Sequence, residues 1–165
     1  MTLDEIREVA AIVGGDRTYR HFVRRINEER NSNVYVLTHE EGDEKVGFCV
    51  IGHSPNKMKV WNNVFKEEGW VDSSFRMDKF PLELMYIYVK PEYRGKGIGT
   101  KLFRNVIDFA YKKEAKQVYA YVSDRSPKAL FFYKKMKAEV IQDFSDEETS
   151  AAFLRWNLKS NQKII

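Results

Sequence analysis

The sequence predicts a single domain of mixed α/β structure, and three observations support this prediction. Residues 82–90 are a β-prone apolar and aromatic run that stops at a proline and leads, through a glycine-rich turn, into an amphipathic helix. Amphipathic helices are predicted before this run, and helices alternate with strands after it. With 165 residues, 43% of them hydrophobic, the chain is long enough to build one continuous core.

Two helices are predicted at the N-terminal end. Residues 2–5 have the spacing of a capping box, and apolar residues follow at helical intervals until Gly14-Gly15. Asp16 can cap a second amphipathic helix, which we expect to end near Asn31. No strand is predicted before the first helix.

A hairpin is predicted next. The β-prone runs 34–38 and 45–52 are joined by a short acidic turn that contains one glycine. Cys49 lies inside the second run, where we expect a packed structural thiol rather than a nucleophile.

Residues 53–81 form an aromatic-rich insertion before the central strand. Val60, Val64 and Phe65 are spaced to line one face of a short helix. Two interpretations stay open, a flap folded onto the core and a lid over a substrate. The carboxylates of the insertion indicate a cationic substrate, although a solvated loop explains the same residues: Glu67, Glu68, Asp72 and Asp78.

The C-terminal half continues the alternation of helices and strands. The pattern predicts a helix over 98–113, a strand over 117–122, a helix over 126–135 and strands over 138–144 and 151–158. We expect the chain from about residue 159 to be frayed.

The turn after the central strand carries the strongest functional signal. Glycines at 95, 97 and 99 permit positive φ angles, which let successive N–H groups converge on an anion. The helix that starts at Ile98 directs its unpaired N–H groups at the same point, and Arg94, Lys96 and Lys101 add positive charge. The order Gly-Thr-Lys argues against a P-loop, and Thr100 stands where a dinucleotide fingerprint needs glycine. This turn is therefore predicted to bind a phosphate.

Two stretches carry a resemblance to a known family. Arg94-x-x-Gly97-x-Gly99, after a strand that ends Tyr-Val-Lys-Pro-Glu-Tyr, resembles the acetyl-CoA signature of the GNAT superfamily of acyl-CoA N-acyltransferases. The stretch from Ser126 to Lys135 is similar to the GNAT helix with the pattern Asn-x-x-Ala-x-x-x-Tyr-Glu-Lys. The resemblance covers residues 82–144. Ser126 replaces the usual asparagine, Lys137-Ala138 replaces Gly-Phe, and the first strand of the family is missing.

The resemblance implies a fold, a reaction and a set of binding residues. The implied fold is one GNAT domain over 1–165, with a mostly antiparallel twisted sheet that splays into a V after the central strand and about four flanking helices. The implied reaction is acetyl transfer from acetyl-CoA to a primary amine, by direct attack in a ternary complex. The implied acetyl-CoA contacts are Ile87, Tyr88, Val89, Arg94, Gly95, Lys96, Gly97, Ile98, Gly99, Thr100 and Ser126.

Two catalytic roles also follow from the resemblance. Tyr133 is the expected general acid, because a tyrosine with an ordinary pKa near 10 is protonated at pH 7 and can donate to the leaving sulfur. The alternative is a core aromatic between Leu130 and Met136. Glu83 is the expected base, acting through a water, and the alternative is a solvated strand glutamate.

Composition limits the remaining possibilities. The net charge of +4 comes from 28 basic and 24 acidic residues that are interspersed, so a nucleic-acid binder is a weaker alternative. A non-catalytic acyl-CoA sensor or interaction module is the alternative from another class. The three histidines lack metal-ligand spacing, and we expect no metal. One cysteine, no signal peptide and no long apolar span predict a cytoplasmic protein without a membrane segment. The resemblance also allows a homodimer, and the acceptor amine is unidentified.

Overall fold

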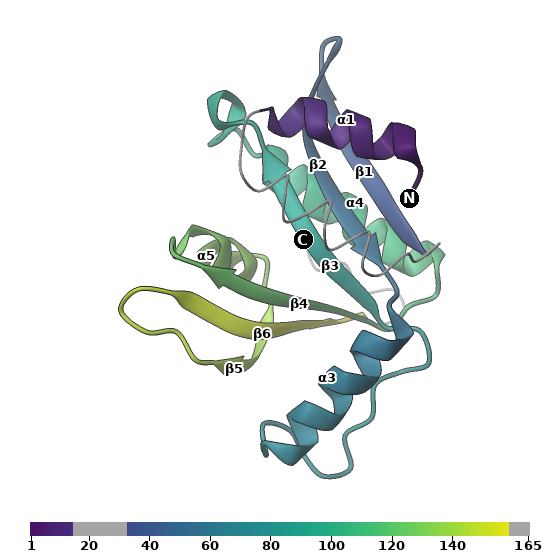
Figure 1. Cartoon of the computed structure of the whole chain (residues 1–165), viewed down its shortest axis with the longest axis vertical. Coiled ribbons are helices and arrows are strands. Elements are labelled where there is room, and N and C mark those ends of the chain that lie inside the picture. Colours follow the sequence, from purple (N-terminus) through teal and green to yellow (C-terminus); the bar gives the residue numbers. More distant parts are fainter. Residues whose placement is uncertain (15–32, 159–165) are drawn as a thin grey trace. The chain divides into compact units, whose positions relative to one another are not determined.

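The computed structural model describes residues 1–14 and 33–158 (Figure 1). The helix expected from Asp16 to Asn31 and the tail from residue 159 lie outside the described residues. The described chain divides into two compact units, which are treated one at a time below. Of the described residues, unit 1 contains 1–14, 33–54 and 84–107, and unit 2 contains 55–83 and 108–158.

The described elements confirm the mixed α/β class. They are α1 (Leu3–Val13), β1 (Val34–Glu41), β2 (Glu44–Gly52), α3 (Pro55–Glu67), β3 (Leu82–Val89), the 3₁₀ turn η1 (Pro91–Tyr93), α4 (Ile98–Lys112), β4 (Gln117–Asp124), α5 (Lys128–Lys135), β5 (Glu139–Asp143) and β6 (Ser150–Asn157). The strand order is β1-β2-β3-β4-β6-β5. The pairs β1–β2, β4–β6 and β5–β6 are antiparallel, whereas β3 pairs with β4 in parallel.

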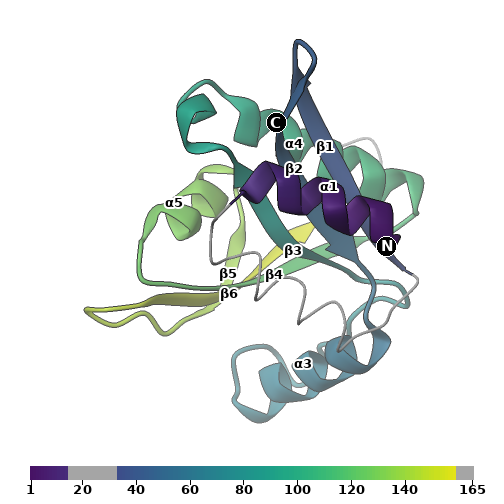
Figure 2. The ribbon, with the colours of Figure 1, turned by 45° about the horizontal axis from the view of Figure 1, so that its top comes forward.

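Unit 1 packs helices on both faces of a hairpin (Figures 1 and 2). The predicted capping box is present: the Thr2 hydroxyl accepts the Glu5 N–H at 3.1 Å, and the Glu5 carboxylate accepts the Thr2 N–H at 3.0 Å. α1 then buries Val9 and its apolar neighbours against β2, where Phe48 and Val50 face it. The strands run closer to the turn than predicted, because Gly42 has a φ of +62° that allows a tight connection.

Cys49 behaves as the sequence predicts. Its side chain is fully buried in β2, and this burial raises the pKa of the thiol to about 12. The thiol is therefore protonated at neutral pH, which confirms a packed structural cysteine.

In unit 2, α5 packs on one face of β4, β6 and β5, while α3 and the chain that follows it cover the other. Successive residues of β6 alternate between the faces, so Phe153 and Arg155 lie toward α3 and Trp156 lies toward α5. Phe65 is fully buried at the centre of the α3 side. Its ring contacts those of Trp61, Trp70, Phe75, Tyr119 and Phe153.

The helix expected around Val60 and Phe65 is confirmed, but one of its predicted apolar positions is wrong. Met58 and Phe65 are buried, whereas the Val60 side chain is 58% exposed. Met58 and Phe65 are seven residues apart and so lie on one face of α3, and this face, without Val60, is the one that is buried.

The described ranges contain neither a helix that could span a membrane nor a cluster that could hold a metal ion. None of the helices within residues 1–14 and 33–158 is long and apolar enough to cross a bilayer. The same ranges contain no group of three or more histidine, cysteine or carboxylate side chains that could hold a metal ion.

Candidate active site

The predicted phosphate turn lies in unit 1, between η1 and α4. We call residues 94–99 the glycine turn. Gly95 and Gly97 have φ angles of +78° and +82°, in the left-handed region that favours glycine. Gly99 differs from the expectation, because it is the second residue of α4 and belongs to a right-handed helix.

The start of α4 presents unpaired backbone donors next to an exposed turn. The Lys101 N–H donates to the Gly97 carbonyl at 3.1 Å, so the helical ladder begins there. The N–H groups of residues 98–100 precede this bond and have no partner within the helix. The first turn of α4 contains no acidic residue, and residues 94–97 are exposed. Such amides fit an anionic group such as a diphosphate.

Glu44, which the sequence reasoning missed, holds the chain that leads into the glycine turn. Its carboxylate accepts the Lys90 ammonium at 2.7 Å and the Tyr93 hydroxyl at 2.8 Å. These bonds lower the pKa of the Glu44 carboxyl. The Lys90 N–H also donates to the Val46 carbonyl at 2.8 Å. Residues of β2 therefore hold both the backbone and the side chain of Lys90.

Arg94 contacts the end of β3 rather than only adding charge to the glycine turn. Its Nε donates to the Val89 carbonyl at 2.8 Å, and its guanidinium lies 5.4 Å from the Tyr88 ring. We expect the Val89 carbonyl to face the pantetheine, and the bond from Arg94 occupies one of the two lone pairs on its oxygen. The Lys96 ammonium lies 5.3 Å from the ring of Tyr93.

Gly47 is a second residue that sequence reasoning missed. A Cβ at this position would lie 3.0 Å from the Tyr88 carbonyl oxygen and 3.1 Å from the Leu102 Cδ1. The glycine therefore lets β2 approach the backbone of β3 where the acetyl-CoA contacts are expected. A glycine inside a strand is itself a signal of such a close approach.

Glu83, the candidate base, lies in unit 2 and is buried. Its side chain is 1% exposed, and the Lys57 ammonium of α3 lies 2.9 Å from its carboxylate. The alternative of a solvated strand glutamate is therefore wrong, because α3 covers this position. Glu83 stands opposite Tyr119 in the β3–β4 pairing and so shares a sheet face with it.

Tyr133 and Ser126 also lie in unit 2, at α5. The Tyr133 ring is 5% exposed and meets the Trp156 ring edge-on at 5.4 Å. The Trp156 indole donates to the Met136 carbonyl at 3.0 Å, which fixes the end of α5 on β6. The Ser126 hydroxyl accepts the Lys128 N–H at 3.3 Å, next to the start of the helix. Tyr133 is thus packed as a core residue, and its role as an acid stays a prediction.

The predicted site residues therefore divide between the units. Unit 1 contains the backbone of residues 87–89 and the glycine turn with Thr100, and unit 2 contains Glu83, Ser126 and Tyr133.

Known proteins resemble this chain in sequence and in fold. Thialysine N-epsilon-acetyltransferase of Bos taurus is 42% identical over 62 residues, which are 38% of this chain and 35% of the bovine protein. The chain spans about a third of the length of the curated relatives it matches.

Among solved structures, the ribosomal-protein-S18-alanine N-acetyltransferase of Escherichia coli superposes with a TM-score of 0.63 at 11% identity, covering 99% of this chain and 96% of that chain. The PaiA N-acetyltransferase of Thermoplasma acidophilum, in complex with coenzyme A, superposes with a TM-score of 0.59 at 16% identity, covering 96% of each chain. Both share the fold. Residues 3–137 match the model of the Acetyltransferase (GNAT) family, and the chain therefore belongs to that family.

Proposed function

We propose that the protein transfers an acetyl group from acetyl-CoA to a primary amine. The observation that carries this proposal is the glycine turn, whose two left-handed glycines stand before the unpaired amides of α4. Amides arranged in this way bind the diphosphate of a nucleotide carrier. The family match and the name of the bovine relative support an amine as acceptor.

In the proposed reaction both substrates are bound together. The diphosphate lies at the glycine turn and the pantetheine follows the backbone of residues 87–89, where the Ile87 N–H donates to the thioester carbonyl. The neutral amine attacks the carbonyl carbon, a C–N bond forms and the C–S bond breaks. The backbone donor stabilises the oxyanion, and the proximity of amine and thioester supplies much of the rate.

Two protons must move in this reaction. Tyr133 donates its hydroxyl proton to the departing thiolate sulfur. In this proposal Glu83, whose buried carboxylate is paired with Lys57, takes the amine proton through a water. Both roles are part of the proposal.

A specific observation favours an alternative, a non-catalytic acyl-CoA sensor. Tyr133 is packed against Trp156, and Glu83 is already bound to Lys57, so both candidate catalytic groups have structural partners. Release of free thiol from acetyl-CoA in the presence of a panel of amines separates an enzyme from a sensor.

The test of the proposed function combines binding and turnover. Titration calorimetry should detect acetyl-CoA binding, and absence of binding at millimolar ligand would refute the proposal. Tyr133→Phe should lower kcat about a hundredfold, the lower range of general acid catalysis, and leave acetyl-CoA affinity unchanged. Equal turnover of the two proteins would remove Tyr133 from the mechanism.

We further propose a cytoplasmic location, because one buried thiol suits a reducing compartment. A homodimer stays a prediction.

A further inference from the structure

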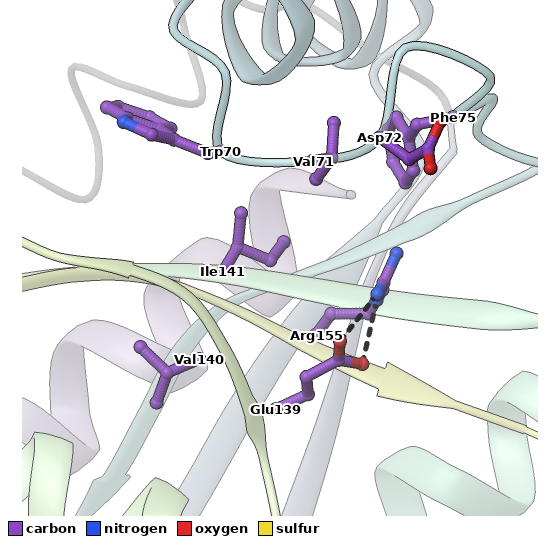
Figure 3. A pocket seen from close by; sticks show the side chains of 8 residues that line it. All are labelled: Trp70, Val71, Asp72, Phe75, Glu139, Val140, Ile141 and Arg155. Atoms are coloured by element: carbon purple, nitrogen blue, oxygen red, sulfur yellow. Dashed lines mark hydrogen bonds and ion pairs between the residues drawn. The ribbon is translucent and has the colours of Figure 1, made fainter.

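A pocket in unit 2 has no role in the proposed reaction. It measures about 310 Å³ and lies between residues 70–75, which follow α3, and the strands β5 and β6 (Figure 3). Its lining combines two aromatic rings, three aliphatic side chains and three charged groups: Trp70, Val71, Asp72, Phe75, Glu139, Val140, Ile141 and Arg155. We call it the Asp72 pocket.

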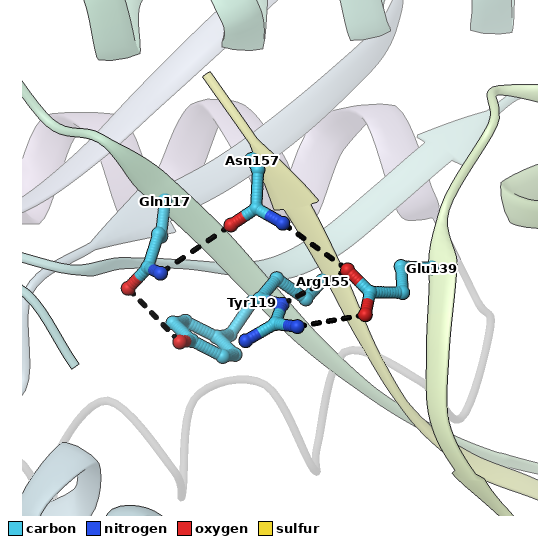
Figure 4. A network of polar contacts seen from close by, with 5 residues as sticks. All are labelled: Gln117, Tyr119, Glu139, Arg155 and Asn157. Carbon is cyan, nitrogen blue, oxygen red and sulfur yellow. Dashed lines mark hydrogen bonds and ion pairs between the residues drawn. The ribbon is translucent and has the colours of Figure 1, made fainter. Parts of the chain in front are cut away.

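Two of the three charges are committed to each other. Arg155 donates from Nη2 to Glu139 at 2.7 Å and from Nε at 3.1 Å, and Asn157 donates to the same carboxylate at 3.1 Å (Figure 4). Asn157 in turn accepts from Gln117, which accepts the Tyr119 hydroxyl at 3.0 Å. The opposite charges of Arg155 and Glu139 cancel, so this ion pair adds little net charge to the pocket. The hydrogen bonds hold both side chains in place.

Asp72 supplies the remaining charge. One of its carboxylate oxygens accepts the Ser74 N–H at 2.9 Å and the Ser74 hydroxyl at 3.0 Å, which holds the side chain in place. Both bonds lower the pKa of the Asp72 carboxyl, so the group is ionised at neutral pH. The structure describes all four carboxylates of the 53–81 insertion, and Asp72 is the one that lines the pocket.

The walls of the pocket suit a cation with an apolar stem. Phe75 already holds the Arg155 guanidinium 5.5 Å from its ring, and Trp70 offers a second aromatic ring across the pocket. Aromatic rings attract ammonium groups, and Val71 and Ile141 add aliphatic surface for a hydrocarbon chain. An ionised carboxylate beside such rings selects a positively charged group over a neutral one.

The pocket and Tyr133 lie on opposite faces of the unit 2 sheet. Arg155 lines the pocket, while its neighbour Trp156 contacts Tyr133 on the other face. A ligand in the pocket would therefore not contact Tyr133.

We propose that the Asp72 pocket binds an alkylammonium group, with Asp72 as its ion partner and Trp70 and Phe75 as its walls.

Cadaverine tests the proposal, because it carries ammonium groups on a five-carbon apolar chain. Titration of cadaverine into the full chain without acetyl-CoA should shift the indole N–H resonance of Trp70, identified with Trp70→Phe. Asp72→Asn should raise the dissociation constant about tenfold, as expected for the loss of a charged partner. Glu68→Gln is the matched control, because it removes an exposed carboxylate of the same insertion that does not line the pocket.

Turnover separates this proposal from the proposed function. Thiol release from acetyl-CoA with cadaverine as acceptor is measured on the same proteins. Loss of all thiol release together with Asp72-dependent binding would refute the acetyl transfer and support the pocket. Binding of cadaverine that is absent, unchanged in Asp72→Asn or equally weakened in Glu68→Gln would overturn the pocket.

Discussion

Replacement of Gly47 by alanine tests whether the spacing of β2 and β3 controls acetyl-CoA binding. The new Cβ would lie 3.0 Å from the Tyr88 carbonyl oxygen and 3.1 Å from the Leu102 side chain. Leu102 can adjust its side chain, whereas the carbonyl can move only with the backbone of β3. Overpacking of this kind costs about 1–3 kcal/mol. For a chain of this size, the cost corresponds to a fall in Tm of roughly 2–12 °C.

The displaced carbonyl belongs to the backbone that is proposed to bind the pantetheine. Gly47→Ala should therefore weaken acetyl-CoA binding in calorimetry, by more than its loss of stability explains. Val9→Ala is the control, because Val9 is fully buried on α1 and its truncation costs stability without adding an atom beside the Tyr88 carbonyl. Wild-type affinity in Gly47→Ala, or an equal loss in both variants, would refute the reasoning.

Two further predictions concern buried groups in each unit. Glu83→Gln should lower the free energy of unfolding in urea by about 3 kcal/mol, because it leaves the Lys57 ammonium without its carboxylate. The pair Lys57→Met with Glu83→Leu should recover most of this loss, and a single variant as stable as wild type would contradict the assignment. Burial raises the pKa of Cys49 from 9.0 to about 12, so above pH 9 the unfolded state loses a proton that the folded state keeps. Stability should then fall by up to about 1.4 kcal/mol per pH unit above pH 9, and Cys49→Ala should flatten this decline; an identical pH profile in the variant would argue against it.

Local signals in the sequence predicted the glycine turn well. The conformations of Gly95 and Gly97 follow from the lack of a Cβ, and the stripe of apolar residues after Ile98 marks α4. These features depend on residues a few positions apart, so the sequence displays them directly. The capping box of α1 belongs to the same class, because its two side chains are three residues apart.

Contacts between distant residues could not be predicted in this way. Glu44 meets Lys90 and Tyr93 across more than forty positions of the chain, and no local pattern marks it. Alternation in β3 could not show that α3 would cover Glu83. The buried Glu83 carboxylate is paired with Lys57. Lys57 belongs to the 53–81 insertion, where the sequence carries only a weak helical signal.

The insertion also explains why the choice between a flap and a lid stayed open. Phe65 is buried against the sheet of unit 2, as a flap requires, while Asp72 remains exposed at a pocket. The pocket takes its other lining from β5 and β6, more than sixty positions further along the chain. A run of aromatic and acidic residues can therefore pack on a sheet and still line a pocket, because its rings face the sheet while a turn leaves one carboxylate exposed. Substitution of Asp72 should change binding without changing stability, and this separates the two roles.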